Sequence, residues 1–262
     1  SGTSIGAVVA AFWASGMEVA EIEKIALRFR RRDLLFSLAD CSLMPLQGFM
    51  NGRNIERFFR KHLGNKTFHD THTPLKVVAN TLRSRENIVI DHGRLVDALR
   101  ASCSIPMFIK PVRYGDDFLI DGGTLDPVPI DILVKNGAKK VIAVNCLPSQ
   151  EEMMKAFKEF EEKRRKDEIR LAQRTVFSRL AYKLNNWVRR TFAPNIFDVM
   201  MNTSLAMQYV FAESSSRDAD CIIHPVLSNT AWFELYKVEA LIRRGEQEAE
   251  KMLPQIKALI ED

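Results

Sequence analysis

The sequence predicts an α/β fold with a mainly parallel central sheet. Short β-branched segments alternate with longer segments of helical period along the 262 residues. The chain is 46% hydrophobic and 27% charged, as in ordinary globular domains, which excludes collagen-like and wholly disordered classes. A chain of this length can bury a core large enough to need no disulfide or metal for stability. We therefore expect one domain over residues 1–262.

Helices dominate the expected first half of the chain. Apolar residues at helical spacing, with glycines just past two of the ends, predict helices at Gly6–Ala14, Val19–Arg32, Ile55–Leu63 and Leu95–Ala101. Runs rich in β-branched residues predict strands at Leu75–Leu82 and Asn87–Ile90.

The second half repeats this alternation around one long insertion. The expected strands are Phe118–Ile120, a buried strand at Lys140–Asn145, and Cys221–His224. The expected helices are Ile130–Lys135, Asn195–Ala212 and Phe233–Ile260. Between them, residues 150–195 form an insertion whose segment Glu151–Arg190 is predicted to be helical and highly charged.

Positive charge is concentrated in this insertion. The whole chain carries a net charge of +5, but residues 163–190 hold ten basic and two acidic residues, or +8. Apolar residues recur there at helical spacing: Phe177, Leu180, Leu184 and Trp187. Two interpretations remain open, a surface helix packed on the core and a helix attracted to an anionic membrane. No nucleic-acid-binding motif accompanies the charge, so we expect no nucleic-acid partner.

The sequence contains no segment expected to cross a membrane. The longest apolar run, Ala7–Ala14, is far shorter than the ~20 residues that span a bilayer, and no secretory signal is evident. The four cysteines are scattered and form no CxxC pair, which suits a reducing cytosol. We expect a cytoplasmic protein that can attach peripherally to a membrane. The oligomeric state is not predicted.

A G-x-S-x-G motif opens the chain at Gly2-Thr3-Ser4-Ile5-Gly6. Such motifs form a sharp strand-to-helix turn that exposes the serine hydroxyl at a helix N-terminus. The flanking glycines permit close backbone approach, and the helix dipole favours a developing oxyanion. Ser4 is therefore a candidate nucleophile.

Several residues could serve as the base that a nucleophilic serine needs. His224 at a strand end would give the order Ser…Asp…His of α/β-hydrolases, although a plain strand-end histidine is the commoner case. His69-Asp70-Thr71-His72 suggests a metal site but is more typical of a loop, and we expect no metal. Asp121, which follows a strand and precedes Gly122 and Gly123, is better placed, because α/β sites gather at the carboxyl ends of strands.

Three motifs together resemble the patatin-like phospholipase family, in particular its small cytosolic bacterial branch. These motifs are Gly2-Thr3-Ser4-Ile5-Gly6, Ala101-Ser102-Cys103-Ser104-Ile105-Pro106 and Asp121-Gly122-Gly123. The resemblance implies a three-layer α/β/α fold. It also implies a Ser–Asp dyad without histidine, with Ser4 as nucleophile and Asp121 as general base. The implied substrates are acyl esters of phospholipids, lysophospholipids or other lipids, and no cofactor is implied.

The sequence departs from that family at two places. Relatives carry a Gly-rich oxyanion loop before the nucleophile, and the chain starts at Ser1, so we expect an N-terminal truncation that could leave this chain inactive alone. Ala79-Asn80-Thr81 stands where relatives tend to have Ala-Thr-Asp, and the sequence suggests no mechanism for this difference. The predicted function is a phospholipase A or lysophospholipase. The alternatives are an acyltransferase or thioesterase with the same dyad, and a non-catalytic membrane-associated or regulatory protein.

Overall fold

The computed structural model describes residues 1–29, 38–42, 47–149, 151–155, 158–159, 162, 165–166, 195–226 and 237–261. Its α-helices are α1 (Ile5–Ala14), α2 (Val19–Arg28), α4 (Arg53–Leu63), α5 (Leu95–Ser102), α6 (Ile130–Lys135), α9 (Ile196–Ser216) and α10 (Val238–Glu261). Two 3₁₀ helices are η1 (Phe68–Asp70) and η2 (Gly122–Thr124). The strands are β1 (Gly2–Thr3), β2 (Val77–Thr81), β3 (Asn87–Ile90), β4 (Val112–Tyr114), β5 (Asp117–Asp121), β6 (Ile142–Val144) and β7 (Cys221–Ile223).

The strands form two sheets in the described part of the chain. The larger sheet has the order β1-β2-β5-β4, with β3 also paired to β2, and the smaller sheet joins β6 to β7. Pairing is parallel in β1–β2 and β6–β7 and antiparallel in β2–β3, β2–β5 and β4–β5. We expected mainly parallel pairing. The antiparallel β2–β3 and β4–β5 pairs follow from short connections, since a parallel pair needs a crossover of a dozen or more residues.

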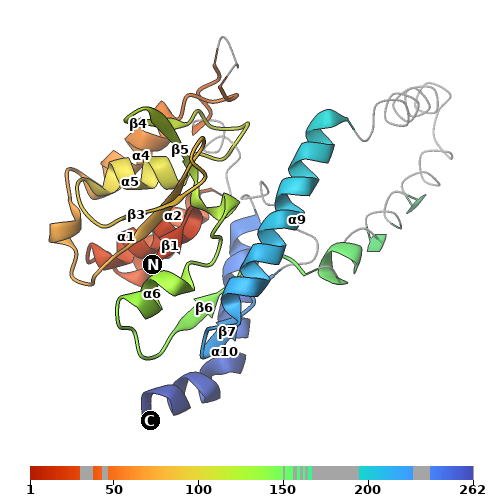
Figure 1. Ribbon diagram of the computed structural model, residues 1–262. Helices are drawn as coiled ribbons and strands as arrows, with labels where there is room; N and C mark the ends of the chain where they lie inside the picture. Colours follow the sequence, from red (N-terminus) through yellow and green to blue (C-terminus); the bar gives the residue numbers. More distant parts are fainter. Residues whose placement is uncertain are drawn as a thin grey trace.

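Helices pack on the sheet through two main groups of buried residues. The larger core joins α1, α2, α4 and α5 to β2, with Phe12, Phe59, Val77 and Leu99 among its members. Figure 1 shows α1, α2, α4 and α5 grouped around the larger sheet, with α9 and α10 beside the smaller one. The second core contains Ala143 of β6 and Ala212 of α9. The α/β class is therefore confirmed, and the layers are consistent with an α/β/α arrangement.

One strand is less buried than the sequence predicted. The expected buried strand at Lys140–Asn145 is β6, which covers Ile142–Val144 only. Ala143 is buried, whereas Ile142 and Val144 are 45% and 53% exposed, so the prediction of a buried strand was wrong. The physical reason is that the described elements cover only the face of β6 that carries Ala143, where Ala212 of α9 joins the same core.

Two expected elements extend beyond the described residues. The helix predicted at Val19–Arg32 is described as α2 up to Arg28, and the helix predicted at Phe233–Ile260 is described from Val238. Most of the basic segment 163–190, including its Phe, Leu and Trp positions, lies outside the described residues.

A buried arginine ties three segments of the fold together. Arg100 of α5 is only 8% exposed. Its guanidinium donates hydrogen bonds to the carbonyl oxygens of Asn51 and Lys110, both at 2.8 Å, and to Ser104 Oγ at 2.7 Å. Burial lowers the pKa of this guanidinium. Arg100 therefore joins the chain before α4 to the turn after α5, which carries part of the site described below.

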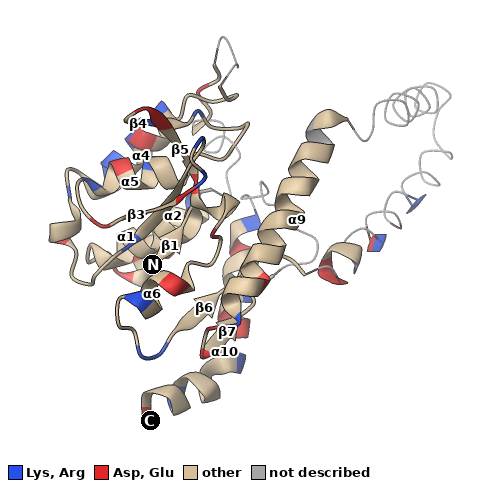
Figure 2. Ribbon diagram, in the orientation of Figure 1, with Lys and Arg blue, Asp and Glu red and all other residues tan. Residues whose placement is uncertain are grey.

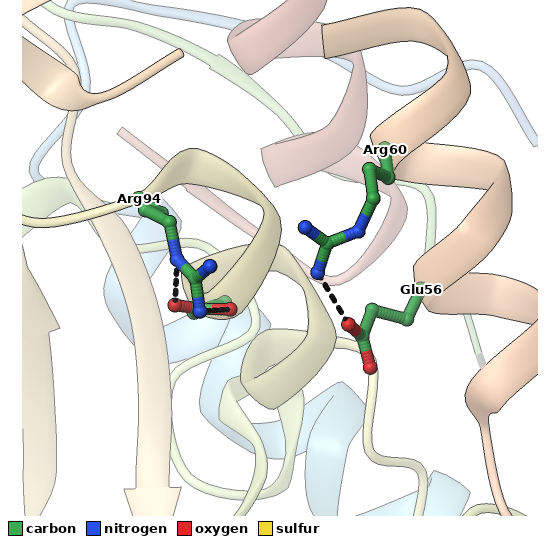
Figure 3. Close-up of polar contacts among 4 residues, drawn as sticks. Glu56, Arg60 and Arg94 are labelled. Atoms are coloured by element: carbon green, nitrogen blue, oxygen red, sulfur yellow. Dashed lines mark hydrogen bonds and ion pairs between the residues drawn. The ribbon is translucent and has the colours of Figure 1, made fainter. Parts of the chain in front are cut away.

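The Arg100→Met variant is expected to lose about 3 kcal/mol of unfolding free energy, because one buried and two partly buried acceptors lose a charged donor while side-chain volume is nearly kept. Urea denaturation measures this loss. Arg94→Met is the matched control: Arg94 Nε bonds Asp97 at 2.8 Å, but both side chains are about half exposed. Figure 3 shows Arg94 with the similarly exposed pair of Glu56 and Arg60. Such pairs contribute about 0–1 kcal/mol, and an equal loss in both variants would contradict the role of Arg100.

Candidate active site

Ser4 occupies the sharp turn between β1 and α1. Its backbone has φ 53° and ψ −124°, a conformation that a residue with a side chain rarely adopts. A Cβ on Gly2 would lie 2.8 Å from Ala7 N and from the Gly6 carbonyl carbon, so this position requires glycine. A Cβ on Gly6 would meet no described atom within 4 Å. The close backbone approach expected from the flanking glycines therefore falls on Gly2.

The helix behind Ser4 places its N-terminus at the serine. Ser4 O accepts the first helical hydrogen bond from Val8 N at 3.1 Å. The N–H groups of the first turn, which begins at Ile5, have no acceptor within the helix and carry the positive end of its dipole. Ala7 and Ala11 are fully buried, which lets α1 pack closely against its neighbours. This end of α1 suits a developing negative charge beside the serine.

Asp121 lies at the end of β5 and is buried. Its Oδ1 accepts a hydrogen bond from Gly123 N at 2.8 Å, and a side-chain hydrogen bond joins it to Ser4. Burial raises the pKa of Asp121 to about 6, while the bonds from Ser4 and Gly123 oppose this rise by favouring the carboxylate. The fold thus brings together two residues that are 117 positions apart in the sequence.

Three consecutive residues at the C-terminal end of α5, Ser102 to Ser104, contact both halves of this pair. Ser102 Oγ accepts a hydrogen bond from Ser4 N at 2.9 Å and donates one to Val78 O at 2.6 Å. Ser104 O accepts from Asp121 N at 3.0 Å. The Cys103 thiol hydrogen-bonds to Ser4, and burial, with the nearby charge of Asp121, raises its pKa. From the sequence, Ser102, Cys103 and Ser104 belonged to a motif, but no role was predicted for any of them.

The turn after Asp121 requires glycine for space. A Cβ on Gly122 would lie 2.5 Å from Val78 O and 3.1 Å from Thr3 Cγ2. A Cβ on Gly123 would lie 3.1 Å from Asp121 Oδ1. Thr3 also bonds across this junction, because its Oγ1 donates to Asp126 O at 2.9 Å. The two glycine motifs therefore pack directly on one another through Thr3.

The histidines and the aspartate considered as a base or as metal ligands make other contacts in the structure. His224 Nε2 lies 3.4 Å from Glu152 Oε2, so this histidine pairs with Glu152. Asp70 accepts hydrogen bonds from Thr67 N and Oγ1 and so caps η1. Among the described residues, no group of three or more His, Cys, Asp or Glu side chains is placed to hold a metal ion. Nor does any helix there combine the length and apolarity needed to cross a membrane.

Comparison with known proteins identifies the family. Residues 1–134, about half of the chain, match the model of the patatin-like phospholipase family. The chain is a member of this family. The matched residues include β1, the Ser4 turn, β2, α5 and the Asp121-Gly122-Gly123 turn, which are the elements that build the site.

Individual relatives of this patatin-like protein are at most 30% identical to it in the examples below, and the alignments cover only part of each relative. The chain is 29% identical over 145 residues to an uncharacterized NTE family protein of Mycobacterium tuberculosis, covering 55% of this chain and 24% of that protein. Over 185 residues it is 30% identical to the uncharacterized protein YqhO of Bacillus subtilis, covering 59% and 63%. It is 23% identical over 259 residues to the lysophospholipase NTE1 of Scheffersomyces stipitis, covering 96% and 16%. The chain thus spans about a quarter of the mycobacterial relative.

Proposed function

We propose that this patatin-like chain hydrolyses acyl esters of phospholipids or lysophospholipids with a Ser4–Asp121 dyad. The observation that carries the proposal is the hydrogen-bonded contact between the strained Ser4 and the buried Asp121 at the N-terminus of α1. A serine nucleophile needs an adjacent base and a site for the oxyanion. Asp121 supplies the base, and the first turn of α1 contributes to the oxyanion site.

The reaction proceeds in two steps. Asp121 takes the proton from Ser4 Oγ as this oxygen attacks the ester carbonyl carbon, and the carbonyl oxygen becomes negatively charged beside α1. The tetrahedral intermediate collapses, the alcohol leaves with the proton held by Asp121, and an acyl-Ser4 ester remains. Asp121 then takes a proton from water, which attacks the acyl ester. As the bond between the acyl carbon and Ser4 Oγ breaks, Asp121 returns this proton to Ser4 Oγ, so the fatty acid leaves and the Ser4 hydroxyl is restored.

The proposed base predicts the pH dependence of hydrolysis. Asp121 accepts a proton only when ionised, and burial raises its pKa to about 6, so kcat/KM is expected to fall about tenfold per pH unit below about pH 6. Initial rates on a p-nitrophenyl ester from pH 4.5 to 9 measure this decrease of kcat/KM at acidic pH. His224→Ala is expected to show the same decrease and to keep most of the activity. If the decrease were absent or occurred at a different pH in His224→Ala, this would contradict Asp121 as the base.

We also propose that the protein acts at an anionic membrane surface. The outer side of α9 carries five apolar residues, each more than half exposed: Ile196, Val199, Met200, Met207 and Val210. Figure 2 shows few charges along α9. The opposite side of α9 adjoins the site, because Gln208 Oε1 lies 3.9 Å from the position of a Cβ on Gly123. The segment 163–190, with its net charge of +8, ends six residues before α9 begins. A basic segment next to an uncharged apolar helix face suits anionic lipid.

Replacing Arg179, Lys183, Arg189 and Arg190 together with Gln is expected to weaken binding to phosphatidylserine-containing vesicles by about tenfold or more, since each basic residue near such a surface contributes about 1 kcal/mol. Met207→Gln with Val210→Gln should weaken binding to a similar extent through lost apolar contact. Vesicle sedimentation measures both, and Val134→Gln, an exposed position on α6, is the control. Binding that matches the unaltered protein would instead favour a basic helix that packs on the core.

A further inference from the structure

Asn80 is a buried amide in the middle of β2. Its side chain is 0% exposed, and the strand residues before it, Val77, Val78 and Ala79, are apolar and equally buried. Its neighbour in the adjacent strand β5 is Ile120, the residue before Asp121. A polar residue in such a place needs hydrogen bonds to offset its lost hydration.

The side-chain amide of Asn80 donates hydrogen bonds to two consecutive backbone carbonyl groups, those of Asp121 and Gly122. Nδ2 lies 3.2 Å from Asp121 O and 2.9 Å from Gly122 O. The amide oxygen Oδ1, in contrast, is buried without a hydrogen-bond partner among the residues that the structure describes. An unpaired buried acceptor is unfavourable, so an apolar residue would suit this position better if the side chain served only to pack the core. Its two donated bonds are the contacts that distinguish it from an apolar residue.

These two hydrogen bonds hold the Asp121-Gly122-Gly123 turn, which sets the orientation of the Asp121 carboxylate. Oδ1 of Asp121 is held by Gly123 N, and this N–H can point at the carboxylate only while the Asp121-Gly122-Gly123 backbone keeps its path. We propose that Asn80 is a positioning residue, which fixes the Asp121 carboxylate toward Ser4 by holding the main chain of this turn. The inference rests on the proposed function for its catalytic meaning, but the contacts themselves do not depend on it.

The surroundings of Asp121 make its titration a usable readout. In the described part of the chain, the titratable side chain placed against it is Cys103, whose pKa is raised, so the thiol stays neutral where Asp121 titrates. The other groups recorded at the carboxylate are the Ser4 hydroxyl and the Gly123 N–H. If the Gly123 bond is loosened, the carboxylate loses a donor that favours its charged form, and its pKa rises further.

The test compares Asn80→Thr with Asn80→Val in the intact protein. The two side chains have nearly the same shape, but only Thr keeps a donor. The amide of Gly123 is observed by NMR with ¹³C-carbonyl, ¹⁵N-labelled glycine, which assigns it because Gly122-Gly123 is the one Gly-Gly pair in the sequence. This amide reports the Asp121 titration midpoint and the hydrogen-exchange rate of the turn without requiring activity. The labelling rate with a fluorophosphonate probe reports the reactivity of Ser4. Asn87→Val is the control, because Asn87 faces Asn80 across β2–β3 but is exposed.

In Asn80→Val we expect hydrogen exchange of the Gly123 amide to be at least about tenfold faster and the Asp121 titration midpoint to lie at higher pH. Labelling of Ser4 by the fluorophosphonate should be at least about tenfold slower. Each value for Asn80→Thr should lie between that of Asn80→Val and that of the unaltered protein. Asn87→Val should match the unaltered protein. Val and Thr variants with equal Gly123 exchange and midpoint would overturn the inference. If β-branched variants do not fold, Asn80→Ser and Asn80→Ala give the same comparison. If the unaltered protein does not label, the proposed function fails, while the Gly123 amide still decides the role of Asn80.

Discussion

Asp121→Asn is expected to abolish ester hydrolysis and, at the same time, to stabilise the folded protein. An amide cannot take the proton from Ser4, so kcat should fall by about 10³-fold or more. Asn keeps the shape of the side chain and an oxygen that can accept from Gly123 N. Loss of activity with a gain in stability separates a catalytic carboxylate from a structural one.

The sign of the stability change follows from the direction of the pKa shift. Burial raises the pKa of Asp121 from 3.8 to about 6, so the folded state disfavours its charge. The destabilisation by this charge is absent below about pH 4, grows as the pH rises through about 6, and reaches about 2–3 kcal/mol at pH 8. Urea denaturation of Asp121→Asn should therefore show a gain at pH 8 that shrinks toward pH 4. A loss of stability at pH 8 would contradict a buried charge at this position.

Gly122→Ala is expected to destabilise the protein by about 3 kcal/mol or more and to remove activity. The added Cβ would lie 2.5 Å from Val78 O and 2.8 Å from its carbon, and both are backbone atoms of a central strand. These two backbone atoms cannot move aside as the end of a flexible side chain can, so either the turn or β2 must shift. Any shift also disturbs Ser102, which donates to the same Val78 oxygen and holds Ser4 N.

Gly245→Ala is the matched control for this substitution. Gly245 lies inside α10, and a Cβ there would meet no described atom within 4 Å. Alanine in a helix is favoured over glycine by about 1 kcal/mol, so thermal denaturation should show a small gain. A loss in Gly245→Ala as large as that in Gly122→Ala would mean that the steric account of Gly122 is wrong.

Local patterns predicted two elements of the fold with their bounds and the two turns that carry Ser4 and Asp121. Asn87–Ile90 and Ile130–Lys135 were predicted with the bounds that β3 and α6 have, because turn residues and period mark their ends. The G-x-S-x-G pattern similarly predicted a sharp turn at Ser4, where the backbone has a positive φ. Asp121 was expected at a strand end because three apolar residues precede it and two glycines follow.

Long-range contacts could not be predicted in this way. Ser102 and Asn80 act on residues 98 and 41 positions away, and nothing in their own neighbourhood encodes these partners. The available signal was a small polar residue inside an apolar run. Similarly, the β4–β5 hairpin closes through Gly115 at φ 55°, but its first strand is too short to show a period. Arg100 resembles any basic residue near a helix end until the chain folds around it.

The most direct test of the dyad is covalent labelling of Ser4 by a fluorophosphonate, with the labelled peptide identified by mass spectrometry. We predict that the intact protein labels at Ser4, that Ser4→Ala and Asp121→Asn do not label, and that His224→Ala labels at nearly the rate of the unaltered protein. A folded protein that does not label, or one in which Asp121→Asn labels as fast as the unaltered protein, would contradict the proposal that Asp121 activates Ser4.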